Sequence, residues 1–437
     1  MRRLVLAILL VVSGPRLAAA EKLTLDQVIA KAIANPRVQM AQEDVGTARA
    51  RLGEADAGRW PKLKATGFAT VSPEIRCIDP TCNVTEPQNF AFRFSGFFGS
   101  IQVDVTQPLY TFGKIDHARR AARAGVAAQK ALADEAAGDA AADAARAYWG
   151  LKLARELGGM LDDGIEEITK AKSQFGERTD ISIQDRQRVE VLLAEAKAQR
   201  AEAMQGELQA LAGLRAITAL PDADIDDDEL AAVQRTLPNE HTLSQDVARR
   251  PQNVAAIAGV TATEQLAAFQ RAYYYPDFAL VGSAWGAKAQ GVDDPPGAFA
   301  NDPFNRFGAG LVLGLQWAFD PWTTKARVDR AEAEARKAKA QANLAAIGAS
   351  YDIAMVTSEA RAAKAKVDAT LEGEKSARTW LASVLQSQAI GTAEPRDLAD
   401  AYIAWFQMKA RWAQAVFQWN VAVVRLGRAI GEYKAGS

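Results

Sequence analysis

Apolar and polar side chains alternate along residues 101–106, which predicts a β-strand with two unlike faces. The apolar face carries Ile101, Val103 and Val105, and the polar face carries Gln102, Asp104 and Thr106. Such a strand requires apolar surroundings on one side and water or polar partners on the other. The pattern therefore predicts either a half-buried sheet in a soluble domain or the wall of a membrane β-barrel.

A very long helix is predicted after this strand. Residues 114–175 contain no proline and are rich in alanine, and their apolar positions keep a helical spacing. At about 1.5 Å per residue, one helix over this range would be roughly 90 Å long. No compact globular core needs a rod of that length, so the pattern predicts a coiled coil or a helical tube.

The same order of features occurs twice in the chain. Three pairs of matching landmarks are each 215 positions apart: Pro36 and Pro251, Pro61 and Pro276, and Gly176 and Gly391. A constant offset over such a length indicates an internal duplication. Each copy is predicted to contain a helix, two strands separated by a polar loop, a long helix, a turn and a second helix.

The duplication sets the expected organisation of the chain. We expect an N-terminal segment at residues 1–20, a first repeat at residues 21–230 and a second repeat at residues 231–437. In the first repeat the predicted strands cover residues 62–71 and 97–107, the helices cover residues 114–175 and 181–218, and an acidic connector follows. In the second repeat the strands cover residues 278–287 and 307–317, and the helices cover residues 324–389 and 395–430.

The second copy repeats the amphipathic pattern. Leu311, Leu313 and Leu315 share one face of its second predicted strand. In the last helix, apolar residues recur every seven positions, at Leu398, Trp405, Trp412, Trp419 and Leu426. A stripe with this spacing forms the seam between packed helices, and we interpret it as core packing rather than as a ligand site.

Composition and charge limit the possible functions. The 437 residues include 52 Lys and Arg against 53 Asp and Glu, so no net field favours nucleic acid. The two histidines, His117 and His241, belong to no recognisable catalytic or metal-binding pattern. We therefore predict no enzymatic activity, no metal site and no cofactor. The acidic segment at residues 221–229 lacks the spacing of a calcium-binding loop and is interpreted as a solvated connector.

The N-terminus has the features of a cleaved secretory signal. Two arginines precede an apolar run at residues 4–12, and small residues stand at Ala18 and Ala20. That run is too short to span a bilayer, and no later stretch reaches the roughly 18–20 apolar residues of a membrane helix. If the protein is in a membrane, strands must carry it.

Two cysteines, Cys77 and Cys82, lie in the polar loop between the first two predicted strands. Oxidation is expected outside the cytoplasm, so a local disulfide between them is predicted for an exported protein. Two cysteines without a nearby histidine make a poor metal site, so the disulfide is the preferred interpretation.

A sheet of four strands in a membrane must be closed into a barrel. An open four-stranded sheet in lipid would leave the backbone groups of its edge strands unpaired, at a cost of several kcal/mol each. Closure must therefore come from several chains. Two chains would close an eight-stranded barrel and three a twelve-stranded barrel, and the width needed to pass solutes favours the larger.

These features resemble the TolC-type outer-membrane efflux proteins. The similarity rests on the export signal, the tandem repeat, the sequence QPLYTFGK at residues 107–114 and the glycines that lead the two turns, Gly176 and Gly391. The resemblance covers the chain from residue 21 onward. It implies a fold that is mainly α with a membrane β-barrel part, in which a homotrimer forms a twelve-stranded barrel continuous with a periplasmic α-helical barrel.

The resemblance also implies a function and partners. Proteins of this family are passive exit ducts. A periplasmic adaptor, or membrane fusion protein, joins the duct to an inner-membrane RND or ABC pump that supplies the energy. We therefore expect a protein of the bacterial outer membrane that extends into the periplasm, contacts outer-membrane lipid, and serves tripartite efflux or type I secretion.

In this family the turns between the long helices narrow the periplasmic entrance. The second turn of this chain matches the family pattern at Gly391 and Thr392, and at two acidic positions, Asp397 and Asp400. Three copies of these carboxylates would repel anions and attract cations. The same carboxylates would also favour the start of a helix, so a purely structural role is the alternative.

The match at the turns is incomplete. The family's arginine is replaced by Ala393, although Arg396 is near, and the first turn has Ser182 where family members can have an aspartate. Asp185 is the first-repeat counterpart of Asp400. We therefore expect an acidic constriction rather than a particular salt bridge between the turns.

The resemblance also orients the strands. Their apolar faces, with Ile101, Val103 and Val105 in one copy and Leu311, Leu313 and Leu315 in the other, are expected to contact lipid. Pro108 and Gly113 are expected to make the bend between strand and helix. The alternative function is a secreted periplasmic coiled-coil scaffold or adaptor without a pore. That alternative explains the heptads and the signal but not the paired alternating strands.

Overall fold

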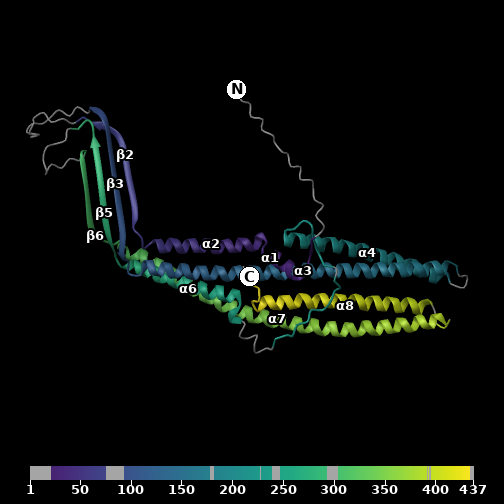
Figure 1. Ribbon diagram of the computed structural model, residues 1–437. Coiled ribbons are helices and arrows are strands. Elements are labelled where there is room, and N and C mark those ends of the chain that lie inside the picture. Colours follow the sequence, from purple (N-terminus) through teal and green to yellow (C-terminus); the bar gives the residue numbers. More distant parts are fainter. Residues whose placement is uncertain are drawn as a thin grey trace, which may run out of the picture. The chain divides into compact units, whose positions relative to one another are not determined.

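The computed structural model describes most of the chain (Figure 1). The described residues are 21–74, 93–177, 182–226, 228–238, 247–292, 304–390, 392 and 395–433. They belong to two compact units. The strand-bearing unit comprises described residues within 46–127 and 257–341, and the helical unit comprises those up to 45, within 128–256 and from 342 onward. Each unit takes residues from both halves of the sequence, so the units cut across the two predicted repeats.

Four antiparallel strands form the sheet of the strand-bearing unit, in the order β2-β3-β5-β6 (Figure 1). They are β2 (Lys62–Pro73), β3 (Phe94–Tyr110), β5 (Asp277–Ala289) and β6 (Arg306–Gln316). Each half of the sequence supplies one neighbouring pair, and β3 and β5 join the pairs at the centre. β2 and β6 are therefore the edges of this sheet, with no further strand beside them in the described part of the chain.

Long helices make up most of the remaining described residues. They are α2 (Pro36–Ala57), α3 (Lys114–Glu177), α4 (Ile183–Thr218), α6 (Pro251–Arg271), α7 (Pro321–Ala389) and α8 (Pro395–Ala429). Four of them begin at a proline, which suits the first helical position because its N–H would have no partner within the helix. α7 has 69 residues, which corresponds to a rod of roughly 100 Å. The expected fold class, mainly helical with long helices and four strands in one sheet, is confirmed.

The helical unit also contains a small parallel sheet that the sequence did not predict. β1 (Glu21–Leu23) pairs with β4 (Ala223–Ile225), and α1 (Leu25–Ile33) follows β1. Thr24 caps α1, because its hydroxyl accepts a hydrogen bond from the Gln27 N–H and its own N–H donates to the Gln27 side chain. Strands of three residues carry too little alternation to be recognised in a sequence.

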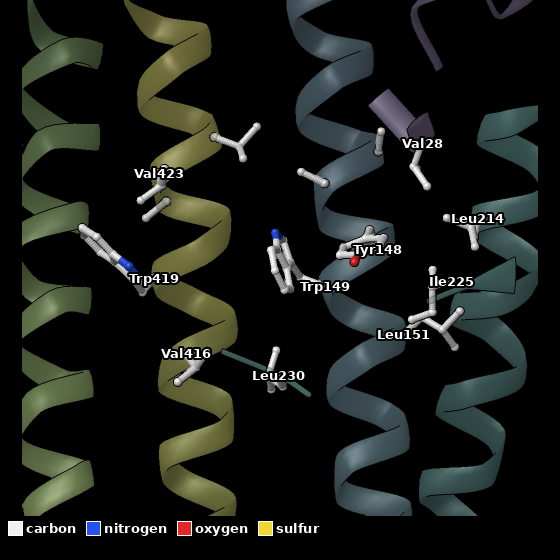
Figure 2. Packing of buried hydrophobic residues seen from close by; sticks show 14 of the residues in the cluster. Val28, Tyr148, Trp149, Leu151, Leu214, Ile225, Leu230, Val416, Trp419 and Val423 are labelled. Carbon is white, nitrogen blue, oxygen red and sulfur yellow. The ribbon is translucent and has the colours of Figure 1, made fainter. Parts of the chain in front are cut away.

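The core of the helical unit combines alanines with a few large side chains, including Trp419 in Figure 2. On α3, Ala137, Ala141 and Ala144 are fully buried, and their small side chains let neighbouring helices approach closely. On α8, Trp419 is 1% exposed, and its indole N–H donates to the Val233 carbonyl oxygen at 2.8 Å. A buried indole needs such a partner. At this position the seven-residue stripe is core packing, as predicted.

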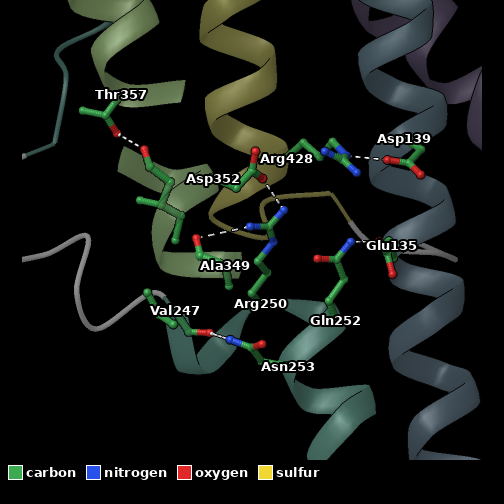
Figure 3. A network of polar contacts seen from close by, with 11 residues as sticks. Glu135, Asp139, Val247, Arg250, Gln252, Asn253, Ala349, Asp352, Thr357 and Arg428 are labelled. Atoms are coloured by element: carbon green, nitrogen blue, oxygen red, sulfur yellow. Dashed lines mark hydrogen bonds and ion pairs between the residues drawn. The ribbon is translucent and has the colours of Figure 1, made fainter. Parts of the chain in front are cut away.

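A polar network lies in the helical unit where α6 begins (Figure 3). Arg250, with a side chain that is 6% exposed, pairs with Asp352 on α7 and donates to the Ala349 carbonyl oxygen at 3.4 Å. Arg428 on α8 pairs with Asp139 on α3. A charge as buried as that of Arg250 is stable only with partners, so the network helps to fix how these helices meet.

Candidate functional site

The register of the four strands divides the sheet into two unlike faces. Val105 on β3 lies opposite both Leu63 on β2 and Gly282 on β5. Gly282 in turn lies opposite Leu311 on β6. Residues directly opposite one another share a face. One face, called the apolar face below, therefore includes Leu63, Val71, Ile101, Val103, Val105, Leu280, Phe307, Leu311, Leu313 and Leu315.

The apolar face brings together the two sets of residues that the sequence predicted to share one environment. Ile101, Leu311, Leu313 and Leu315 are 59%, 69%, 66% and 58% exposed, and Val103 and Val105 are half-buried. Gly282 leaves space on β5 that the Leu311 side chain approaches, because a Cβ at residue 282 would lie 3.4 Å from it. A continuous exposed apolar surface of this kind marks a surface that contacts another apolar phase or partner.

The opposite face of the same strands is polar. Lys64 on β2, Asp104 on β3 and Ser283 on β5 lie side by side across it. The Asp104 carboxylate accepts hydrogen bonds from the Ser283 hydroxyl at 2.6 Å and from the Gln102 side-chain amide at 3.0 Å. An ionised carboxylate held in this way needs water or polar groups on its side of the sheet.

Trp285 lies on the polar face, and Gly308 on β6 makes room for its indole. The two residues lie opposite each other, and a Cβ at position 308 would come within 2.6 Å of the indole. Gly310 lies on the same face with open space beside it. The glycine at position 308 is therefore required by a close approach, whereas the one at position 310 is not.

β3 passes into α3 through a tight turn. Phe112 has a φ of 49° and Gly113 a φ of 88°, both in the left-handed region that favours glycine. The Phe112 ring stacks on Tyr275 with 5.2 Å between centroids, which supports this strained position. The prediction that Pro108 makes the bend was wrong. Pro108 stays within β3 beside a register irregularity, where a strand tolerates a residue without an N–H.

Lys114 fastens this turn to β5. Its side chain is 12% exposed, and its ammonium donates to the Asp277 carboxylate at 2.8 Å and to the Tyr275 carbonyl oxygen at 3.0 Å. His117, in the next turn of α3, hydrogen-bonds to the Gln265 side chain at 2.9 Å. Both residues therefore have structural contacts. Among the residues that the structure describes, no group of three metal-binding side chains could hold an ion.

The turn between α7 and α8 carries the predicted acidic positions. Asp397 lies in the first turn of α8, and both Asp397 and Asp400 are exposed. Arg396 approaches Asp400 at 3.8 Å along the same helix. Thr392 donates its hydroxyl and its backbone N–H to the Ser387 carbonyl oxygen at the end of α7. This geometry is compatible with an acidic constriction and with a helix-start role, so the constriction stays a prediction.

The turn between α3 and α4 differs from the sequence expectation. α3 ends at Glu177, so Gly176 lies within the last turn of the helix instead of leading the turn. Ser182 precedes α4, and its carbonyl oxygen accepts a hydrogen bond from the Arg186 N–H at 3.2 Å. Asp185 lies in the first turn of α4. Of the other predicted site residues, Cys77, Cys82 and Gly391 lie outside the described residues.

The acidic connector is not the solvated segment that its composition suggested. Ala223 and Ile225 are fully buried, and Asp224 and Asp226 alternate with them. Asp224 pairs with Arg155 of α3 at 2.6 Å. The alternation was visible in the sequence, but the density of carboxylates led to the wrong interpretation. The structure corrects the interpretation of a solvated connector, because an ion pair holds this part of it against α3.

A buried lysine holds a second carboxylate of the connector, that of Asp226. The Lys152 ammonium lies 2.5 Å from Asp226 and donates to the Asp228 carbonyl oxygen at 2.8 Å. The Tyr148 hydroxyl donates to the second Asp226 oxygen at 2.8 Å. Burial acts to raise the pKa of Asp226, but the hydrogen bonds from Lys152 and Tyr148 outweigh it, and the pKa is lowered overall.

The sequence and the fold of the chain were compared with those of known proteins. Residues 242–432 match a sequence family described as outer membrane efflux protein. Comparison with curated protein sequences gives no match. Among solved structures, the Campylobacter jejuni CmeC outer membrane channel is 16% identical with a TM-score of 0.77, over 94% of this chain and 87% of that chain. The Vibrio cholerae outer membrane protein VceC is 18% identical with a TM-score of 0.76, over 94% and 96% of the two chains.

The Neisseria gonorrhoeae MtrE outer membrane channel is 19% identical with a TM-score of 0.74, over 93% and 88% of the two chains. Identities this low show a shared fold. None of the helices in the described ranges combines the length and the hydropathy that crossing a membrane requires. The family match adds the function: the protein is an outer-membrane exit duct that extends into the periplasm, and it is not an enzyme. The family match over residues 242–432 and the shared fold confirm the predicted resemblance to the TolC-type outer-membrane efflux proteins.

Proposed function

We propose that three copies of this chain form the passive outer-membrane duct of a tripartite efflux or type I secretion system. The observation that carries the proposal is the sheet, which has one apolar face, one polar face and two open edges. A sheet with these three properties suits the wall of a water-filled barrel in lipid.

Closure of this sheet would require further copies of the chain. In lipid, unpaired N–H and C=O groups along β2 and β6 would each cost several kcal/mol. Pairing β2 of one copy with β6 of the next would remove every edge in a closed ring. Two copies would give eight strands, a barrel that side chains fill, whereas three would give twelve strands and leave a passage. We therefore favour a homotrimer.

In such a barrel, one face of the sheet would contact lipid and the other would contact water. The apolar face, which carries Ile101, Val103, Val105, Leu311, Leu313 and Leu315, would contact outer-membrane lipid. The polar face, with Lys64, Gln102 and Asp104, would line the water-filled duct. This orientation satisfies both the exposed apolar surface and the hydrogen-bonded carboxylate.

The proposed partners of the duct come from the family resemblance. As the resemblance implies, an inner-membrane RND or ABC pump would supply the energy. A periplasmic adaptor would join pump and duct. Asp397 and Asp400 of each copy, with Arg396 and Thr392 beside them, would form the acidic constriction at the periplasmic entrance.

Fractionation separates this proposal from a scaffold without a pore. A duct should require detergent for extraction from outer membranes, run as an oligomer that heat dissociates, and give conductance steps in planar bilayers. Release with the soluble periplasmic fraction, together with absence of conductance, would favour the secreted coiled-coil scaffold and refute the duct.

A matched pair of variants tests the orientation of the sheet. Leu313→Arg puts a charge on the apolar face, where lipid contact would cost about 2–4 kcal/mol near the middle of the bilayer. We expect this variant to assemble poorly in outer membranes. Gly310→Ser adds a polar group to open space on the polar face and should assemble normally. Equal assembly of the two variants would contradict the proposed orientation.

A further inference from the structure

The polar face of the sheet carries more cations than carboxylates. Apart from one carboxylate at the start of β5, its described charged residues are Lys62 and Lys64 on β2, Arg306 on β6 and Asp104 on β3. Lys64 lies directly opposite Asp104. Arg306 lies opposite Ala287, which lies opposite Ser100 on the same face of β3 as Asp104. Three cations therefore share this face with one carboxylate.

Two further charges of the strands do not alter this balance. Asp277, at the start of β5, pairs with Lys114 at 2.8 Å, so the two charges cancel. Lys288 lies opposite Gly99, which is two residues from Ile101, and therefore belongs to the apolar face. With three cations and one carboxylate, the described polar face has a net charge of +2 per chain.

We propose that this charge makes the outer-membrane section of the duct favour anionic solutes. The inference rests on the proposed trimeric duct, in which three copies of the polar face line one lumen. Fixed positive charge on a low-dielectric wall raises the local concentration of anions and lowers that of cations. The solutes that pass this section most readily are therefore negatively charged.

The width of the barrel decides how far these charges act. Twelve strands about 4.8 Å apart and tilted by about 40° close into a cylinder roughly 24 Å across. The Debye length is about 30 Å at 0.01 M salt, about 8 Å at 0.15 M and about 3 Å at 1 M. The wall charges therefore reach the whole lumen at 0.01 M, much of it at physiological salt and little of it at 1 M.

The carboxylates of the proposed constriction would act in the opposite sense. Asp397 and Asp400 favour cations, so the selectivity of the whole duct combines two contributions of opposite sign. The absolute selectivity of the wild-type protein cannot separate them. The difference between the wild type and a variant of the sheet isolates the contribution of the barrel wall.

The test measures ion selectivity of the purified full-length protein in planar phosphatidylcholine bilayers. Reversal potentials in a KCl gradient of about 0.1 M to 0.01 M give the permeability ratio of Cl⁻ to K⁺. Lys62→Gln combined with Lys64→Gln removes two of the three cations and should lower this ratio by about threefold or more. Lys288→Gln removes the same kind of charge from the apolar face and should leave the ratio unchanged. At about 1 M KCl the difference should disappear.

The outcomes distinguish this inference from the proposed function. If the double variant conducts with the wild-type ratio, or if Lys288→Gln shifts the ratio equally, the inference is wrong and the duct stands. If the double variant does not assemble, Arg306→Gln provides the same measurement on β6, with a lower ratio expected. Absence of conductance from the wild-type protein would overturn both the duct and the inference.

Discussion

Replacing Lys152 with methionine should release the acidic connector from α3. The Lys152 side chain is 5% exposed, and its ammonium lies 2.5 Å from Asp226 and donates to the Asp228 carbonyl oxygen at 2.8 Å. Methionine keeps much of the aliphatic length but removes both polar contacts. The Asp226 carboxylate, with a side chain that is 20% exposed, would keep the hydrogen bonds from the Tyr148 hydroxyl and the Asp228 backbone N–H.

The size of the effect follows from burial. Removing one partner of a buried ion pair costs about 3–5 kcal/mol. Asp226 is partly exposed and keeps its bond to Tyr148, so we expect the lower end, about 3 kcal/mol. At about 1.4 kcal/mol per tenfold change, the open population of the connector should rise roughly hundredfold.

Lys409 offers a matched control. Its ammonium lies 4.0 Å from Glu156, and the two side chains are 25% and 30% exposed. A pair this open and this long contributes less than about 1 kcal/mol, so Lys409→Met should raise the open population by no more than about fivefold. Both variants remove one lysine charge from the helical unit and differ in the burial of the pair that is broken.

Hydrogen exchange followed by mass spectrometry measures the opening. The parallel pairing of β4 with β1 protects amides of the connector, which exchange when the two strands separate. A peptide over residues 220–230 should exchange roughly hundredfold faster in Lys152→Met, while peptides from β3 should be unchanged. If Lys152→Met gives no acceleration, or no more than Lys409→Met, the assignment of the connector's stability to this pair is wrong.

Three further predictions concern pH, a close approach and the turn. The pKa of Asp226 in the folded protein lies below its ordinary value of 3.8, so its pairing stabilises the fold fully above that value and is lost as the pH falls below it. The melting temperature followed by circular dichroism should therefore fall more between about pH 5 and about pH 3 in the wild type than in Asp226→Asn; equal falls would contradict the sign of the shift. Gly308→Ala should lower the temperature at which the oligomer dissociates on a gel, because the new Cβ meets Trp285, whereas Gly310→Ala should not; equal temperatures would show that the indole moves aside freely. Asp397→Ala with Asp400→Ala should weaken the block of single channels by multivalent cations, and an unchanged block would favour the helix-start role of these carboxylates.

Local alternation is the part of the fold that the sequence predicts well. The period of two at Ile101, Val103 and Val105 predicts a strand with an apolar and a polar side, and this depends only on neighbours along the chain. The register across strands depends on distant residues. Only the structure shows that Leu311 and Leu313 extend the same face as Ile101, through β5.

The connector shows how composition can mislead. Its carboxylates suggested solvation, yet Asp224 and Asp226 have cationic partners on α3. Arg155 precedes Asp224 by 69 positions, so no local pattern links them. The turn between β3 and α3 shows a second limit of prediction from sequence. Proline suggested the bend at position 108, but the turn is made by Phe112 and Gly113, and a left-handed phenylalanine has no sequence signature.

The turns between the long helices show a third limit of prediction from sequence. A constriction is a property of several copies, because its charges act on each other across an axis that one chain does not contain. Asp397 and Asp400 are exposed in the single chain, as carboxylates would be both at a helix start and in a ring. Their role therefore depends on neighbours that neither the sequence nor a single chain supplies.

The charges of the polar face also constrain the register of the proposed barrel. A one-residue slip of β2 against β3 would turn every β2 side chain to the other face. Lys62 and Lys64 would then meet lipid, at about 2–4 kcal/mol each near the middle of the bilayer and less near its surface. Leu63 and Val71 would meet water at the same time. The cations that would give the lumen its field would therefore also oppose the wrong pairing, so folding and anion preference would both keep them on this face.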